Sequence, residues 1–163
     1  MSNLSPLYKT MNSKILFLDF DGVLITHESE PARLPLGLGK NEMRSLKKIL
    51  AAVNCKIVVT STFRVGKPIV WFRELFGAYN IEPERVLDST PVIKDAKRGV
   101  EIDAWLKSHT KVRNFVILDD TADLGMHEDR LIRVDFNVGL TSADADKAIK
   151  MFGQAWSGRN SHD

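Results

Sequence analysis

Two pairs of carboxylates follow apolar segments that lie far apart in the sequence. Asp19 and Asp21 come at the end of ILFLDFD, and Asp119 and Asp120 come directly after FVIL. Four carboxylates brought together repel one another unless a hard cation lies between them, and a set of oxygen ligands suits Mg²⁺. Zinc usually recruits histidine or cysteine, and this chain has a single cysteine. The pattern therefore predicts a magnesium site that uses all four aspartates.

The spacing of the first pair also predicts two different chemical roles. In Asp19-Phe20-Asp21-Gly22, alternate side chains share an orientation where a strand ends, and the glycine permits a sharp turn. Asp19 is the candidate nucleophile, and its attack on a phosphoryl group would give an aspartyl-phosphate. Asp21 is placed to protonate the departing oxygen and later to activate water. We therefore expect phosphoryl-transfer chemistry at this end of the strand.

The elements that must position these residues alternate along the chain. Buried strands are predicted at residues 15–20, 55–60, 86–87, 115–118 and 131–135, and amphipathic helices at residues 41–53, 69–79, 99–108 and 143–152. Strands separated by helices predict βαβ units and a mostly parallel sheet with helices on both faces. In such sheets ligands bind beyond the carboxyl ends of the strands, which is where both acidic pairs fall.

Length and composition limit the other possibilities. The 163 residues suit one compact domain, predicted over residues 14–152, between a loose leader (1–13) and a flexible tail (153–163). The 23 basic and 21 acidic residues leave a net charge of +2, too slight for a nucleic-acid coat. The absence of a long apolar run, a signal peptide and a pair of cysteines predicts a cytoplasmic protein with no membrane partner.

Four segments resemble a known superfamily. ILFLDFDGVL resembles motif I of the haloacid dehalogenase-like (HAD) superfamily, whose members mostly hydrolyse phosphate esters through a phosphoaspartate and Mg²⁺. IVVTS at residues 57–61, KRGVEI at 97–102 and VILDD at 116–120 resemble motifs II, III and IV, in the expected order. The resemblance implies a three-layer, Rossmann-like α/β fold and a phosphoric monoester hydrolase.

Motif II implies a hydroxyl group that holds the phosphoryl group. Its placement at the strand end favours Thr60 or Ser61 over Thr62. Arg64 follows in TSTFR, which is similar to an SSWR-like segment of the HAD domain associated with RNA-repair proteins. A guanidinium there would clamp phosphate bidentately. RGVEIDAWL at residues 98–106 and VDFNVGLT at 134–141 also resemble segments of that domain.

Motif III implies a cation that offsets the charge of the phosphoaspartate, and three residues compete for this role. Arg98 directly precedes the predicted helix and is favoured, although most HAD proteins use lysine; Lys97 is the second choice, and Lys94 also lies nearby. Motif IV leaves open which of its two aspartates binds the metal directly. Asp123 either supports the metal or faces solvent.

The short intervals between motifs predict a substrate class. Only a flap near residues 25–39 fits between motifs I and II, so no large cap is expected and the site should be open. Capless HAD proteins often act on macromolecules, which implies a phosphorylated nucleic-acid end or a phosphorylated protein. We therefore predict a Mg²⁺-dependent phosphatase. The alternatives are a phosphate- or nucleic-acid-binding module with little turnover, and a phosphotransferase; the oligomeric state stays open.

Overall fold

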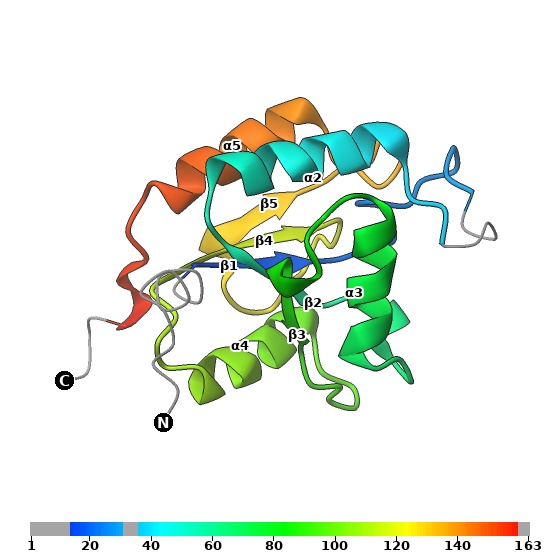
Figure 1. Cartoon of the computed structure of the whole chain (residues 1–163). Helices are drawn as coiled ribbons and strands as arrows, with labels where there is room; N and C mark the ends of the chain where they lie inside the picture. The colour runs from blue at the N-terminus through cyan, green and yellow to red at the C-terminus, as the bar shows by residue number, and fades with distance from the viewer. Residues whose placement is uncertain (1–13, 31–35, 160–163) are drawn as a thin grey trace, which may run out of the picture.

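The computed structural model describes residues 14–30 and 36–159, in which strands and helices alternate until the last two strands, which follow each other with only a 3-10 turn between them (Figure 1). They are β1 (Lys14–Leu18), α2 (Lys40–Ala52), β2 (Lys56–Val59), α3 (Ile69–Ala78), β3 (Val86–Ser89), α4 (Arg98–Ser108), β4 (Asn114–Asp119), β5 (Leu131–Arg133) and α5 (Ser142–Phe152). Every strand and helix predicted from the apolar periodicity is present, with ends that differ by two residues at most.

All five strands form one parallel sheet in the order β3-β2-β1-β4-β5, so the predicted three-layer, Rossmann-like α/β fold is confirmed. The chain fills one half of the sheet from β1 to β3 and then crosses to β4. Leu18 is in register with Val59 on one side and with Leu118 on the other. The next residues, Asp19 and Asp119 among them, are therefore level at the point where the strand order reverses, which is the usual ligand crevice of such sheets.

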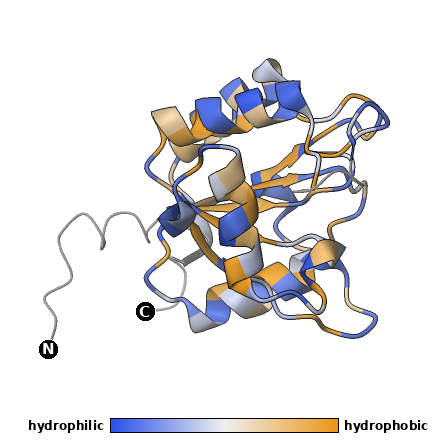
Figure 2. Cartoon of the chain, turned by 45° about the vertical axis from the view of Figure 1, so that its right-hand side comes forward, coloured by the Kyte–Doolittle hydropathy of each residue, from blue (hydrophilic) through white to orange (hydrophobic). Residues whose placement is uncertain are grey.

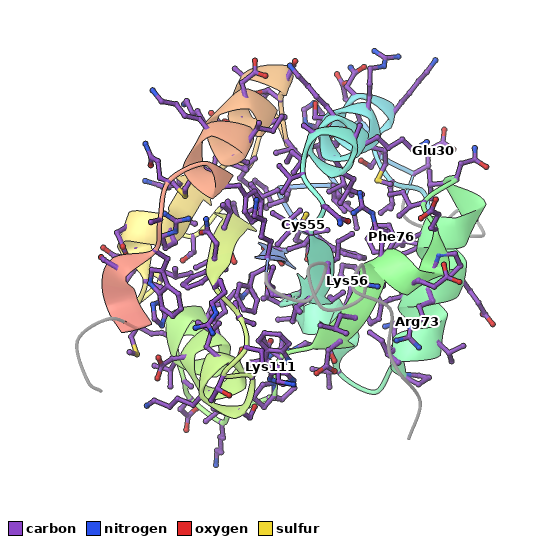
Figure 3. All side chains as sticks on the ribbon, turned by 60° about the vertical axis from the view of Figure 1, so that its left-hand side comes forward. Glu30, Cys55, Lys56, Arg73, Phe76 and Lys111 are labelled. Atoms are coloured by element: carbon purple, nitrogen blue, oxygen red, sulfur yellow. The ribbon has the colours of Figure 1, made fainter. Side chains whose placement is uncertain are left out.

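Helices cover both faces of the sheet (Figure 1), and two hydrophobic cores hold them to it. The larger core joins α2, α3 and α5 to one face, and includes Cys55 and Phe76, which Figure 3 labels. The smaller core joins α4 to the other face through Phe17 of β1 and Trp105 of α4. Strand side chains alternate between the faces, so Asp19 points to the same side as Phe17, toward α4. Colouring by hydropathy shows the strands as the apolar centre of the molecule (Figure 2).

Phe20 fixes the segment between the two catalytic candidates. Its ring is fully buried on the side opposite Asp19 and makes edge-to-face contacts with Phe72 and Phe76 of α3, with ring centroids 5.6 and 5.8 Å apart. Such aromatic pairs contribute about 0.5–1.5 kcal/mol each beyond their buried area. The aromatic cluster therefore anchors the strand end on which Asp19 and Asp21 are carried.

The ends of the predicted domain are described only in part. Residues 1–13 and 160–163 of the predicted leader and tail lie outside the described residues. The start of the tail, however, packs on the core: Trp156 lies edge-to-face on Phe115 at 4.6 Å, and the side chain of Asn114 donates hydrogen bonds to the carbonyls of Phe152 and Gln154. The described start of the tail therefore packs against the core through Trp156, and the flexibility of the tail stays a prediction.

The connections that position the site are short. Those after β2, β3 and β4 consist of loops and 3-10 turns and carry no cap domain, as expected. The predicted flap lies partly outside the described residues, at 31–35. No described helix is both long enough and apolar enough to cross a membrane.

Candidate active site

Three carboxylates converge where β1 and β4 end. Oxygen atoms of Asp19, Asp119 and Asp120 all lie within 4.8 Å of one another. Asp19 and Asp119 are buried and Asp120 is half-buried. Carboxylates lose their hydration in such a place, so they require hydrogen-bond donors or cations close by.

Arg98 provides one such cation from the first residue of α4. Its Nη1 lies 2.6 Å from Asp119 Oδ2 and 2.9 Å from Asp19 Oδ2. Gly99 allows the helix to come this close, because a Cβ there would lie only 2.4 Å from the carbonyl oxygen of Leu124. The geometry thus puts Arg98, the favoured motif III residue, against both aspartates.

The other two candidate cations lie elsewhere. Lys97 Nζ pairs with Asp123 Oδ2 at 2.5 Å, where both side chains are largely exposed, and this hydrogen bond lowers the pKa of Asp123. The pair lies on the rim of the cavity, outside the group formed by Asp19, Asp119 and Asp120. Lys94 is exposed and does not line the cavity.

Burial and crowding shift the ionisation of the carboxylates. In the metal-free site, burial raises the pKa of Asp19 to about 7, the neighbouring Asp119 adds to the rise, and Arg98 opposes it. Burial also raises the pKa of Asp119, again against the effect of Arg98. A divalent cation would favour the charged form of both groups.

The hydrogen bonds distinguish the two aspartates of motif IV. Asp119 already accepts on both oxygens: Oδ2 from Arg98, and Oδ1 from the backbone N–H of Thr121 at 3.0 Å. Asp120 lies on the cavity wall beside Asp19. Oxygen ligands at this spacing fit Mg²⁺, and the geometry makes Asp19 and Asp120 the better pair to hold it.

Asp21 lines the same cavity but differs from the other acids. Its side chain is exposed, and its carboxylate is not in the group of three. The structure therefore does not bring Asp21 into the predicted four-aspartate metal site, because the chain turns away after Asp19, where the N–H of Gly22 donates to the carbonyl of Ile25 at 2.8 Å. The placement suits exchange of protons with solvent or substrate.

The hydroxyl groups after β2 do not lie as predicted. Thr60 is fully buried, with no hydrogen-bond partner for its Oγ1 among the described residues. Ser61 is also buried, and its Oγ accepts a hydrogen bond from the N–H of Phe63 at 3.2 Å. Thr62, ranked below these two by its place in the sequence, is the hydroxyl residue of this segment that lines the cavity. Thr62 begins the 3-10 turn after β2 and is exposed at the cavity, a position that the apolar pattern does not reveal.

Arg64 has a structural role in place of the predicted phosphate clamp. Its side chain is 3% exposed, and its five N–H groups are all used. The acceptors are the carbonyl oxygens of Thr60, Ser61, Thr90 and Pro91 and the carboxylate of Glu101, at 2.6 to 3.1 Å. Arg64 thus ties the loops after β2 and β3 to α4, and no N–H is left for a substrate.

Glu101 completes this arrangement, and the sequence pattern does not predict its role. Its second oxygen accepts from the N–H of Ile93 at 3.0 Å, and the residue lies one helical turn after Arg98, on the cavity wall. An acid between Val100 and Ile102 near a helix start is the only sequence signal that it gives. The open cavity, of about 520 Å³, thus has acids on the sheet side and Arg98 on the helix side.

A family described as the HAD domain in Swiss Army Knife RNA repair proteins matches residues 15–145. The chain belongs to this family. The match runs from β1 into α5 and includes all four motifs, so the resemblance to this RNA-repair HAD domain is confirmed. A comparison with curated proteins found no match. As a HAD domain, the chain has the scaffold of a phosphatase-like hydrolase.

Proposed function

We propose that this HAD domain is a Mg²⁺-dependent phosphatase that removes a phosphoryl group from a phosphomonoester through an aspartyl-phosphate. The observation that carries the proposal is the contact of Arg98 with both Asp19 and Asp119 at the switch point of the sheet. This contact supports Asp19 as the nucleophile, Arg98 as a fixed cation and Asp19 with Asp120 as the metal-binding pair, since all of them line one cavity.

The reaction divides between Asp19 and Asp21. A carboxylate oxygen of Asp19 attacks phosphorus, the bond to the ester oxygen breaks, and Asp21 gives its proton to that oxygen. Asp21, now a carboxylate, then takes a proton from water as the water oxygen attacks the same phosphorus. Phosphate leaves, Asp19 is regenerated and Asp21 is protonated again, so atoms and protons balance over the cycle.

The remaining residues stabilise charge and hold geometry. Arg98 favours the ionised form of Asp19 and faces the phosphoryl oxygens, and Asp119 keeps the guanidinium in place. Mg²⁺ held by Asp19 and Asp120 would neutralise negative charge on the transferred group. Thr62 is the side chain best placed to donate a hydrogen bond to that group.

The substrate class follows from the family and from the open cavity. Membership among HAD domains of RNA repair proteins supports a phosphorylated nucleic-acid end, and a phosphorylated protein is the second possibility. A cytoplasmic location accords with a single free, buried cysteine. A phosphotransferase would use the same first step but deliver the group to an acceptor other than water.

The test is phosphate release from an aryl phosphate and from phosphorylated oligonucleotides, with and without Mg²⁺. Asp19→Asn should reduce release to background, and Asp21→Asn should reduce it by about 10²- to 10⁴-fold. Asp146→Asn, which removes only a surface partner of Lys48, is the matched control and should have no effect. Full activity of Asp19→Asn would refute the proposal. Tight binding of the oligonucleotides without release by the intact chain would support a binding module instead.

A further inference from the structure

Exposed apolar side chains gather at the edge of the sheet that holds the cavity. All eight large hydrophobic residues that are exposed in the described part of the chain lie after a strand, either in the following loop or in the first turn of α3 or α4. Because these helices run back from the carboxyl ends of the strands, their first turns lie at the same edge. Phe136, which follows β5, is the one aromatic residue of this set.

Phe136 lies directly beside the catalytic segment. The residue is 57% exposed. Gly22 has a φ of +76°, and a Cβ at that position would come within 2.5 Å of Phe136 Cδ2 and 3.1 Å of Asp120 Cγ. One edge of the ring therefore packs on the backbone of Gly22, next to Asp21 and Asp120, while more than half of the residue remains open to solvent.

The loop that carries the ring is fixed to the site by backbone hydrogen bonds. The N–H of Val134 donates to the carbonyl of Asp119 at 2.9 Å, and the N–H of Leu140 donates to that of Val23 at 2.9 Å. Between them, the N–H of Gly139 donates to the carbonyl of Asp135 at 2.8 Å and closes a tight turn. The ring is thus held at a defined place relative to β4 and to the Asp21 turn.

We propose that Phe136 stacks on the nucleobase of the nucleotide that carries the phosphate, and so selects nucleic-acid ends over other phosphoesters. This inference rests on the proposed phosphatase function. Asp21 serves the departing oxygen, so the leaving group extends toward Asp21 and Gly22, where the ring lies. In a nucleotide, one sugar separates the phosphate from a flat base, whereas phosphoserine and phosphothreonine carry no ring at that position. Aromatic side chains stack on any base, which suits an end of variable sequence.

The test compares substrates that differ only in the base. Short single-stranded oligonucleotides carry a 3′- or 5′-phosphate on either a normal or an abasic terminal nucleotide, and acetyl phosphate serves as a substrate with no leaving base. Phe136→Leu should lower kcat/KM on the normal ends by about tenfold and leave the abasic ends and acetyl phosphate unchanged. Phe136→Trp should retain activity on the normal ends. Val92→Ala, which shortens another exposed side chain of the same edge, is the control and should change nothing.

Several outcomes would overturn the inference without touching the proposed function. An equal loss on normal and abasic ends, or an equal loss in Val92→Ala, would show a general apolar effect. A phosphotyrosine peptide is assayed as a further substrate. If Phe136→Leu loses activity on this peptide alone, the ring contacts protein substrates and not nucleobases. If the wild-type chain releases no phosphate even from acetyl phosphate, the proposed function fails. In that case, fluorescence anisotropy of oligonucleotide binding still tests the stacking. If Phe136 stacks on the base, Phe136→Leu binds normal ends more weakly than the wild type does; equal binding would overturn the inference.

Discussion

Two arginines meet at the first turn of α4, and their surroundings differ: Arg98 is the first residue of this helix, and Arg64 reaches it from the loop after β2 through Glu101. Arg64 is 3% exposed and gives all five N–H groups to four carbonyls and Glu101. Arg98 is 20% exposed, lines the cavity, and contacts Asp19 and Asp119 through Nη1 alone. A guanidinium whose donors are all used within the protein holds loops together, whereas one with donors facing a cavity can meet a substrate.

The largest effect is expected from removing the arginine that is fully bonded. Arg64→Ala leaves Glu101 buried without its partner and several carbonyls without donors, so the free energy of unfolding should fall by about 3–5 kcal/mol. The midpoint of thermal unfolding measures this loss. Lys48→Ala, which breaks a surface pair with Asp146 at 2.7 Å, is the control and should cost less than about 1 kcal/mol. A similar small cost for Arg64→Ala would end the distinction between the two arginines.

Removing the other arginine should affect catalysis more than folding. Arg98→Met should lower kcat by about 10²- to 10³-fold, as for loss of one fixed donor to a transition state. With Mg²⁺ present, its unfolding midpoint should stay close to that of the wild type, since the cation would offset the carboxylates that remain. Steady-state phosphate release and thermal unfolding give both quantities. Loss of stability as large as that of Arg64→Ala would contradict this assignment.

The crowded carboxylates beside Arg98 should also make stability depend on pH. Burial raises the pKa of Asp19 from 3.8 to about 7 without metal, so between these values the folded chain keeps a proton that the unfolded chain has lost. The contribution of Asp19 to the free energy of unfolding is therefore full below about pH 4 and falls as the pH rises to about 7. Asp19→Asn should remove this dependence, and Mg²⁺ should restore stability above pH 7. Urea unfolding at a series of pH values measures this dependence of the free energy of unfolding on pH. The prediction is contradicted if the stability of the wild type without metal depends on pH no more than that of Asp19→Asn.

The smallest effect is expected at the lysine that competed for the motif III role. Lys97 pairs with Asp123 on the cavity rim, where water screens both charges. Lys97→Gln should therefore change kcat by less than about threefold. A loss comparable to that of Arg98→Met would move the cation of motif III to Lys97.

The sequence predicts the sheet and the meeting of Asp19 with Asp119, though not the place of Asp21 outside their group, and the reason is simple. The carboxyl ends of parallel strands meet at one edge, so Asp19 and Asp119 are together once two apolar runs are identified as neighbouring strands. The roles of Arg64 and Arg98 cannot be separated in this way. Each arginine lies in the chain between a strand and the helix that follows or begins there. Arg64 is distinguished by its hydrogen bonds to the carbonyls of Thr90 and Pro91, which are remote from it in the sequence.

The same limit explains the hydroxyl group and the exposed ring. The place of Thr62 on the cavity wall depends on the 3-10 turn after β2, and the exposure of Phe136 depends on how a tight turn places it beside Gly22. Neither arrangement leaves a period or a spacing in the sequence. Local patterns therefore predict which elements meet at the site, while nonlocal contacts decide which side chains face the cavity.

The most direct test of the account is to trap the intermediate on Asp19. The wild-type chain is incubated with acetyl phosphate and Mg²⁺, quenched in acid, and reduced with borohydride, which converts a phosphorylated aspartate to homoserine. Peptide mass spectrometry then locates the modified residue. We predict homoserine at position 19, none at Asp21, and none anywhere in Asp19→Asn. Phosphate release by the wild type without modification at Asp19, or with modification elsewhere, would contradict the central claim.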